Sequence, residues 1–170
     1  MINGHGDDLY KYNVEVKSNF SSNIYSHADL SGLKKYLASR MDVIGSYPEP
    51  EPYSLEKALA EECGIEANEI MVTNGATEAI YLAARLTNEK LAGSGINLIS
   101  MPTFSEYADA CRMAGGKTMS SESGYRGEAT HWMCNPNNPT GTVIGGKELL
   151  NIAAESKNDI FVIDQSYEHY

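Results

Sequence analysis

The chain has 170 residues, of which 42% are apolar, and its 13 basic and 23 acidic residues give a net charge of −10. This length and apolar fraction allow one sizeable hydrophobic core. The acidic balance argues against nucleic acid or an anionic membrane as the main partner, and no run approaches the ~18 apolar residues of a membrane span.

The first 46 residues are predicted to form an irregular arm followed by a helix. Residues 1–28 show little apolar periodicity and many polar side chains, so no regular element is expected there. An apolar stripe at helical spacing then predicts a helix from Leu30 to Met41, with Asp29 as its N-cap. We therefore separate residues 1–46 from residues 47–170.

The second part begins with a stiff connector. Pro48, Pro50 and Pro52 favour an extended backbone, because proline fixes φ and restricts the residue before it. A second helix is predicted over Ser54–Cys63, and Gly64 is the residue expected to end it.

From residue 70 onward the pattern alternates between strands and helices. The predicted strands are Ile70–Thr73, Ile96–Ser100, Lys117–Ser121, His131–Cys134 and Asp159–Asp164, and the predicted helices are Thr77–Leu86, a segment opened by the capping-box spacing Thr103 to Glu106 and running to Met113, and Lys147–Glu155. Such alternation is typical of a mostly parallel sheet covered by helices. The predicted fold class is therefore α/β, with three α/β/α layers.

Each predicted strand is followed by a loop with polar or aromatic side chains, and such loops gather at the carboxyl edge of an open sheet. The loop Asn135–Gly141 contains two prolines and a glycine, so it must turn sharply and project asparagines. Gly75, Ala76 and Thr77 precede a helix, where free N–H groups, a hydroxyl and the helix dipole favour a phosphate. Taken alone, each loop is equally well explained as an ordinary turn.

Other side chains in these loops suit a flat, charged ligand. Phe104 and Tyr107 could offer an aromatic face, although separately they are more typical of a core. Asn138 can donate a hydrogen bond to a phenolate oxygen, and Tyr167 can reach the same ligand. Asp164 ends an apolar strand and needs a positive partner such as a protonated ring nitrogen, a helix cap or ion pair being the alternative. Together these groups meet the needs of pyridoxal phosphate (PLP), whose ring acts as an electron sink.

Four segments resemble, in order, the motifs of the class I/II PLP-dependent aminotransferases, and within them the histidinol-phosphate aminotransferase group. They are Gly75–Glu78, Pro102–Phe104, Asn135–Gly141 and Asp164–Tyr167. The resemblance spans nearly the whole chain. It implies the fold type I PLP-dependent transferase fold, with residues 47–170 as an incomplete large PLP-binding domain. It also implies an aminotransferase that acts, via an external aldimine, at the α-carbon of an amino acid or amine bearing a phosphate.

The resemblance also implies a role for each loop. Gly75, Ala76 and Thr77 would bind the cofactor's phosphate, and Phe104 would stack on its ring. Asn138 and Tyr167 would contact the ring oxygen, and Asp164 would pair with the ring nitrogen, which makes Asp164 and Tyr167 the expected catalytic residues.

Tyr47 resembles a tyrosine that this group sends to the neighbouring subunit's phosphate, which implies a homodimer. His5, Ser21 and Asn23 lie in segments that resemble the opening of threonine-phosphate decarboxylase, a lyase of the same family, and are expected to bind substrate. Transamination and decarboxylation both remain open from these residues.

A more remote alternative is a non-catalytic Rossmann-like phosphate-binding module, although the chain lacks a dinucleotide fingerprint.

The chain departs from the family pattern in one respect. The family's Schiff-base lysine and substrate-binding arginines follow the aspartate motif, and the chain ends at Tyr170 before them. We therefore expect a fragment of a longer enzyme that is inactive alone.

Cysteine usage predicts neither a disulfide framework nor a metal site. Cys63, Cys111 and Cys134 are odd in number, widely spaced and without a CxxC pair. The chain start also lacks the basic and apolar segments of a signal peptide. A reducing cytoplasm is the expected location.

Overall fold

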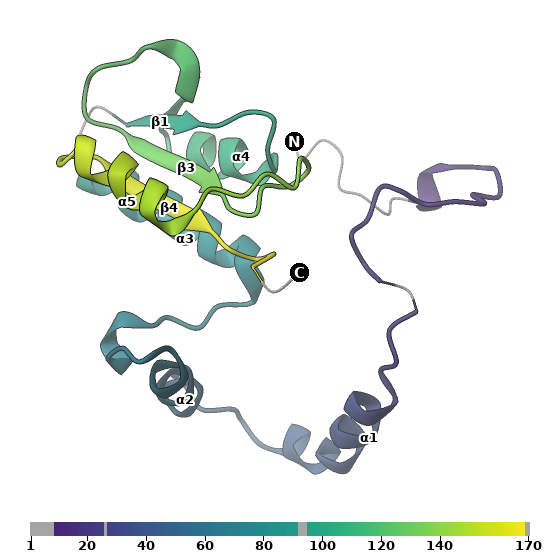
Figure 1. Cartoon of the computed structure of the whole chain (residues 1–170). Coiled ribbons are helices and arrows are strands. Elements are labelled where there is room, and N and C mark those ends of the chain that lie inside the picture. The colour runs from purple at the N-terminus through teal and green to yellow at the C-terminus, as the bar shows by residue number, and fades with distance from the viewer. Residues whose placement is uncertain (1–8, 26, 92–94, 169–170) are drawn as a thin grey trace. The chain divides into compact units, whose positions relative to one another are not determined.

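A computed structural model describes residues 9–25, 27–91 and 95–168 of the chain (Figure 1). Their contacts form two compact units, one within Gly4–Val72 and the other within Thr73–Tyr170. The domain boundary between residues 46 and 47 stays a prediction. None of the described helices is both long and apolar enough to span a membrane.

The unit within Gly4–Val72 contains helices α1 (Ser31–Ser39) and α2 (Tyr53–Cys63). Oδ1 of Asp29 accepts a hydrogen bond from the Ser31 backbone N–H at 2.9 Å, and this bond lowers the pKa of Asp29. Gly64 ends α2 with a φ of 70°, a left-handed conformation that glycine adopts at little cost. The short 3-10 helices of this unit are Leu9–Lys11, Met41–Gly45 and Ala67–Glu69.

The unit within Thr73–Tyr170 is built on a parallel sheet, which in the described residues has the strand order β2-β1-β3-β4. The strands are β1 (Ile96–Ile99), β2 (Lys117–Ser120), β3 (Thr130–Cys134) and β4 (Ile160–Asp164). In the register of the two longest strands, Cys134 lies opposite Asp164. The loops that follow these strands therefore start from the same edge, and the predicted parallel sheet is confirmed.

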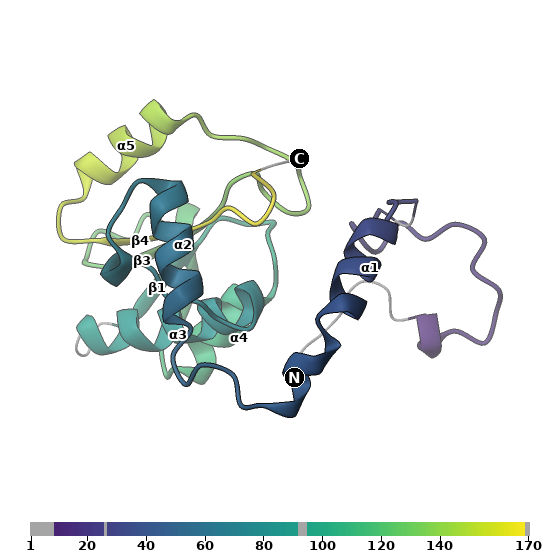
Figure 2. The ribbon, with the colours of Figure 1, turned by 90° about the horizontal axis from the view of Figure 1, so that it is seen from below.

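Helices cover both faces of this sheet. Helices α3 (Gly75–Lys90) and α4 (Glu106–Met113) pack together on one face, and α5 (Gly146–Glu155) lies on the other (Figures 1 and 2). A 3-10 turn, Ser121–Ser123, follows β2. This arrangement confirms the predicted three-layer α/β/α architecture.

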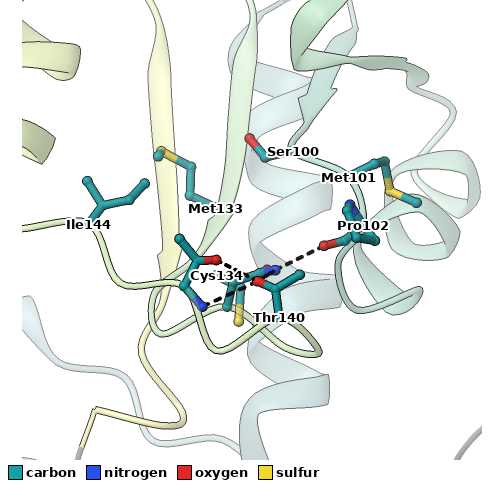
Figure 3. Close-up of a pocket in the computed structure, with 9 residues that line it drawn as sticks. Ser100, Met101, Pro102, Met133, Cys134, Thr140 and Ile144 are labelled. Atoms are coloured by element: carbon teal, nitrogen blue, oxygen red, sulfur yellow. Dashed lines mark hydrogen bonds between the residues drawn. The ribbon is translucent and has the colours of Figure 1, made fainter.

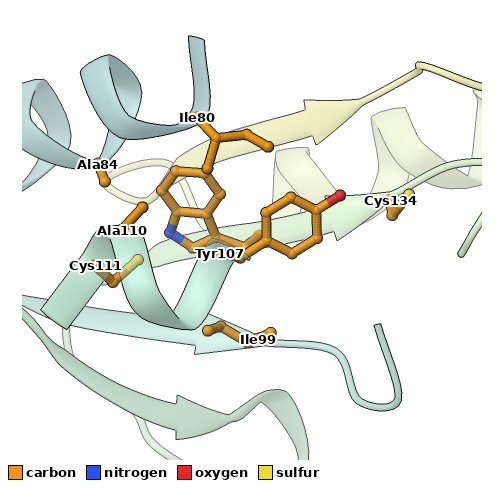
Figure 4. Packing of buried hydrophobic residues seen from close by; sticks show 8 residues of the cluster. Ile80, Ala84, Ile99, Tyr107, Ala110, Cys111 and Cys134 are labelled. Atoms are coloured by element: carbon orange, nitrogen blue, oxygen red, sulfur yellow. The ribbon is translucent and has the colours of Figure 1, made fainter. Parts of the chain in front are cut away.

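The hydrophobic core of this unit lies between the sheet and helices α3 and α4 (Figure 4). Trp132 and Tyr107 are each 1% exposed, and their rings stack with centroids 5.8 Å apart. The indole N–H of Trp132 donates to Oδ1 of buried Asn97 at 2.9 Å. Burial raises the pKa of the Cys111 thiol to about 12. The other members of the cluster are Ile80, Ala84, Ile99, Ala110 and Cys134.

Two carboxylates of this unit are held by aromatic side chains. Glu106 is fully buried, and its Oε2 accepts a hydrogen bond from the Tyr81 hydroxyl at 2.8 Å, which raises the pKa of Tyr81. Asp159 precedes β4, and its Oδ2 lies 2.7 Å from Nε2 of His131. Its Oδ1 accepts from the Ala129 backbone N–H. Both oxygens of Asp159 therefore have partners that compensate for the loss of water, whereas the Tyr81 bond compensates Oε2 of Glu106.

One predicted element is wrong. Residues 70–73 form no strand in the described range 27–91, and the Val72 N–H donates to Oε1 of Glu56 at 3.0 Å instead of to a neighbouring strand. Helix α3 begins at Gly75, two residues before the predicted start at Thr77.

Candidate functional site

A pocket of about 230 Å³ opens where the loops after β1, β3 and β4 meet the N-terminus of α3. Its lining residues are Gly75, Ala76, Thr77, Phe104, Tyr107, Cys134, Asn138, Asp164, Ser166 and Tyr167. The structure thus brings together the residues that the sequence predicted for a phosphate, a planar ring and its polar edges. Their individual roles stay predictions.

The N-terminus of α3 forms one wall of the pocket. Gly75 has a φ of 77°, which side chains rarely adopt, and its N–H donates to the Thr73 carbonyl at 2.8 Å. The next two N–H groups, of Ala76 and Thr77, belong to the first turn and have no acceptor within an α-helix. Together with the exposed Thr77 hydroxyl and the positive end of the helix dipole, they favour an anion.

Phe104 forms a second wall, in the loop after β1. Its ring meets the Tyr107 ring edge to face, with centroids 5.9 Å apart. The predicted capping box beside it is wrong, because the Thr103 hydroxyl donates to Oδ1 of Asn137 at 2.8 Å and α4 begins without a side-chain cap. That bond ties the loop after β1 to the loop after β3.

The loop Asn135–Gly141 is held by its own asparagines. The buried Asn135 side chain accepts from the Ile144 N–H at 2.7 Å and donates to the Ile144 carbonyl at 2.9 Å. Asn137 donates to the Pro102 carbonyl and to the Thr140 hydroxyl. The structure thus gives these two asparagines loop-positioning roles that the sequence did not predict.

Asn138 is the asparagine of this loop that lines the pocket. Its side chain makes no hydrogen bond to the described part of the protein, so its amide can still donate to a ligand.

Asp164 lies at the carboxyl end of β4, and both of its side-chain oxygens have protein partners. Its Oδ2 accepts a hydrogen bond from the Tyr107 hydroxyl at 2.8 Å. Its Oδ1 accepts from the Ser166 N–H at 2.9 Å and from the Ser166 hydroxyl at 2.6 Å. A serine two residues after an aspartate is a recognisable turn pattern, whereas no local signal links Tyr107 to a residue 57 positions away.

Tyr107 is not the stacking surface that the sequence suggested, since its ring packs on Trp132 inside the core. Burial is the main reason that its pKa is raised far above the usual range, and hydrogen bonds with Cys134 and Asp164 contribute further. The hydroxyl therefore stays protonated and remains a donor.

A second pocket, of about 240 Å³, is shown in Figure 3, and it shares Cys134 with the first pocket. Its lining residues are Ser100, Met101, Pro102, Met133, Cys134, Asn137, Thr140, Thr142 and Ile144. None of them carries a charge, and the Asn137 amide is already hydrogen-bonded within the loop. We therefore assign the functional site to the pocket that contains Asp164.

The structure does not place the remaining predicted residues in this pocket. Tyr47, Ser21 and Asn23 belong to the other compact unit, where Tyr47 is fully exposed. The Ser21 hydroxyl donates to Oδ1 of Asn19 at 2.7 Å. His5 lies outside the described residues.

The donor and acceptor groups define the ligand that the pocket suits. An anion fits the N-terminus of α3, a flat ring fits the face of Phe104, and a cationic N–H fits the carboxylate of Asp164. Residues 9–25, 27–91 and 95–168 contain no cluster of three or more His, Cys, Asp or Glu side chains that could hold a metal ion. The site is therefore suited to an organic phosphate with a protonated ring.

Comparison with known proteins identifies a family and several relatives. The family model for aminotransferase class I and II matches residues 15–170. The adenosylcobalamin biosynthesis bifunctional protein CobDQ of Leptospira interrogans is 28% identical over 98% of this chain and 22% of its own length. Histidinol-phosphate aminotransferase 2 of Methylococcus capsulatus is 32% identical over 73% of this chain and 38% of its own.

A solved structure is similar in fold and sequence. The L-threonine-O-3-phosphate decarboxylase of Porphyromonas gingivalis superposes with a TM-score of 0.76 at 32% identity, over 86% of this chain and 46% of its own. The chain thus spans less than half the length of each of these three relatives.

Proposed function

The chain belongs to the aminotransferase class I and II family, and from this premise we propose that the full-length protein containing it is a PLP-dependent enzyme. Members of this family use PLP, and the residues around Asp164 fit that cofactor. The observation that carries the proposal is the convergence of an anion-binding helix N-terminus, an aromatic wall and a clamped carboxylate on one pocket.

Each wall of the pocket then has a role. The N–H groups of Ala76 and Thr77, after the turn at Gly75, bind the cofactor's phosphate, and Phe104 covers one ring face. Asn138 and Tyr167 donate to the ring oxygen. When bound, PLP supplies an electron sink for bonds at the substrate's α-carbon.

Asp164 has the central role among these residues. Its carboxylate accepts the N–H of the ring nitrogen and stabilises the proton there, because an anion at hydrogen-bond distance favours the charged form of its partner.

We propose an amino acid or amine that bears a phosphate as the substrate, with transamination as the reaction. The likeness to a histidinol-phosphate aminotransferase supports this choice. Decarboxylation is the second candidate, because the Porphyromonas gingivalis structure is that of a threonine phosphate decarboxylase. His5, Ser21 and Asn23 are proposed to bind the substrate's phosphate or carboxylate.

Two incubations of the full-length enzyme distinguish these reactions. Histidinol phosphate with 2-oxoglutarate should give glutamate if the enzyme transaminates, and threonine phosphate alone should give carbon dioxide if it decarboxylates. Both assays should be accompanied by the visible absorbance of bound PLP. An intact protein that shows neither product nor PLP absorbance would contradict the proposed function.

We propose that the Schiff-base lysine and the substrate-binding arginines lie beyond residue 170, and that residues 1–170 alone give no turnover. The greater length of the relatives supports this proposal. On this view residues 47–170 are part of the large PLP-binding domain, and residues 1–46 are an arm and helix. We propose the cytoplasm as the location.

We further propose that the enzyme is a homodimer in which Tyr47 reaches the phosphate in the neighbouring subunit. The full exposure of Tyr47 on a proline-rich connector is compatible with a contact outside its own unit. Sedimentation should therefore give a dimer, and Tyr47→Phe should weaken PLP binding. A fully active monomer would exclude this assembly.

A further inference from the structure

Within the described residues, donors occupy all but one of the acceptor positions of the Asp164 carboxylate. An ionised carboxylate offers about four lone-pair positions, two on each oxygen. Both positions on Oδ1 are taken by the backbone and hydroxyl donors of Ser166, at 2.9 and 2.6 Å. On Oδ2 the Tyr107 hydroxyl takes one position, at 2.8 Å. The remaining position is therefore on Oδ2, the oxygen that Tyr107 already contacts.

The packing around Tyr107 fixes its hydrogen bond to Oδ2 of Asp164. Its ring is 1% exposed, stacks on Trp132 at an interplanar angle of 26° and meets Phe104 edge to face. The Trp132 ring is in turn fixed by its hydrogen bond to Asn97. The direction from which Tyr107 donates is thus set by the packing of the core.

We propose that Tyr107 and Ser166 are positioning residues that orient the Asp164 carboxylate, so that Oδ2 presents its remaining acceptor position to the cofactor's ring nitrogen. This inference rests on the proposed function and concerns residues to which that function assigned no direct contact with the ring. Tyr107 acts on the oxygen that receives the ring N–H, whereas Ser166 stops the carboxylate from rotating. Loss of Tyr107 should therefore have the larger effect.

The alternative is that these bonds only stabilise the fold at the end of β4, and the chain offers matched controls. Tyr81 donates to buried Glu106 at the same distance, 2.8 Å, but does not line the pocket. Ser120, the last residue of β2, accepts a hydrogen bond from the Glu122 N–H, also outside the pocket. Tyr81→Phe therefore removes a comparable tyrosine-to-carboxylate bond, and Ser120→Ala removes a serine hydroxyl that forms a local turn, without touching Asp164.

The experiment compares Tyr107→Phe and Ser166→Ala with these two controls in the full-length enzyme. Apo protein is titrated with PLP, and the pH at which the bound cofactor's visible absorbance changes is recorded. We expect Tyr107→Phe to weaken PLP binding about tenfold and to shift that pH, because a hydrogen bond to a charged group is lost. Ser166→Ala should weaken PLP binding about threefold, and the PLP affinity of both controls should stay within about twofold of wild type.

Two results would overturn the inference, and they can be told apart. If the wild-type enzyme binds PLP but Tyr107→Phe behaves like Tyr81→Phe, the hydroxyl has only a structural role and the proposed function stands. If the wild-type enzyme does not bind PLP, the proposed function and this inference fail together. Thermal unfolding of all variants shows whether the tyrosine variants lose stability equally.

Discussion

Replacing Asp164 by Ala should lower the turnover of the full-length enzyme by at least about a thousandfold. The change removes the anion that is proposed to keep a proton on the ring nitrogen. It also leaves the Tyr107 hydroxyl, which is buried and stays protonated, without its carboxylate acceptor. Steady-state kinetics should show the loss mainly in kcat, because the electrostatic effect is largest where charge develops in the transition state.

Asp164→Glu tests position as well as charge. The extra methylene moves the carboxylate away from Tyr107 and Ser166, so this variant should also be strongly impaired. Asp159→Ala is a suitable control, because Asp159 is a carboxylate just before the start of β4, away from the pocket and paired with His131. The Asp159→Ala variant should lose stability but keep the turnover of the wild-type enzyme. Near-normal turnover of Asp164→Ala would refute the role assigned to Asp164.

Replacing Trp132 by Ala should cost about 3–5 kcal/mol of the free energy of unfolding. The indole is 1% exposed, packs on Tyr107 and belongs to the core between the sheet and helices α3 and α4. The change opens a large cavity and removes the donor to Oδ1 of buried Asn97, which adds the cost of an unsatisfied acceptor. Urea unfolding measured against wild type gives the difference.

Two further variants separate these contributions. Trp132→Phe keeps an aromatic ring but loses the indole N–H, so it should cost less than Trp132→Ala. Met113→Ala, at a side chain of α4 that is 76% exposed, should change stability by no more than about 0.5 kcal/mol. If Trp132→Ala cost as little as Met113→Ala, the described core would be wrong.

Much of the α/β layering could be predicted from the sequence because its signals are local. Apolar runs located β1, β3 and β4, the glycine pair Gly115–Gly116 preceded β2, and Gly64 ended α2 as expected. Residues 70–73 carried the same apolar signal but form no strand in the described residues, since a strand also needs a neighbour to receive its hydrogen bonds. Val72 instead donates to a side chain of α2.

The candidate site could be predicted only in part, because sequence signals are local and some of its contacts are not. Motif and strand-end signals pointed to Asn138 and Asp164, which the structure places in one pocket. The bonds that orient that pocket join residues far apart, such as Thr103 with Asn137 and Tyr107 with Asp164. Such partners become visible only once the chain has folded.

The strand order β2-β1-β3-β4 also explains why the pocket lies where it does. The chain winds outward from β1 to β2 through α4, and outward from β3 to β4 through α5, in opposite directions. Because crossover connections between parallel strands are right-handed, opposite winding directions put α4 and α5 on opposite faces. The chain leaving β1 and the chain leaving β3 therefore lead to helices on opposite faces, and the winding reversal between these neighbouring strands places a crevice at this edge of the sheet.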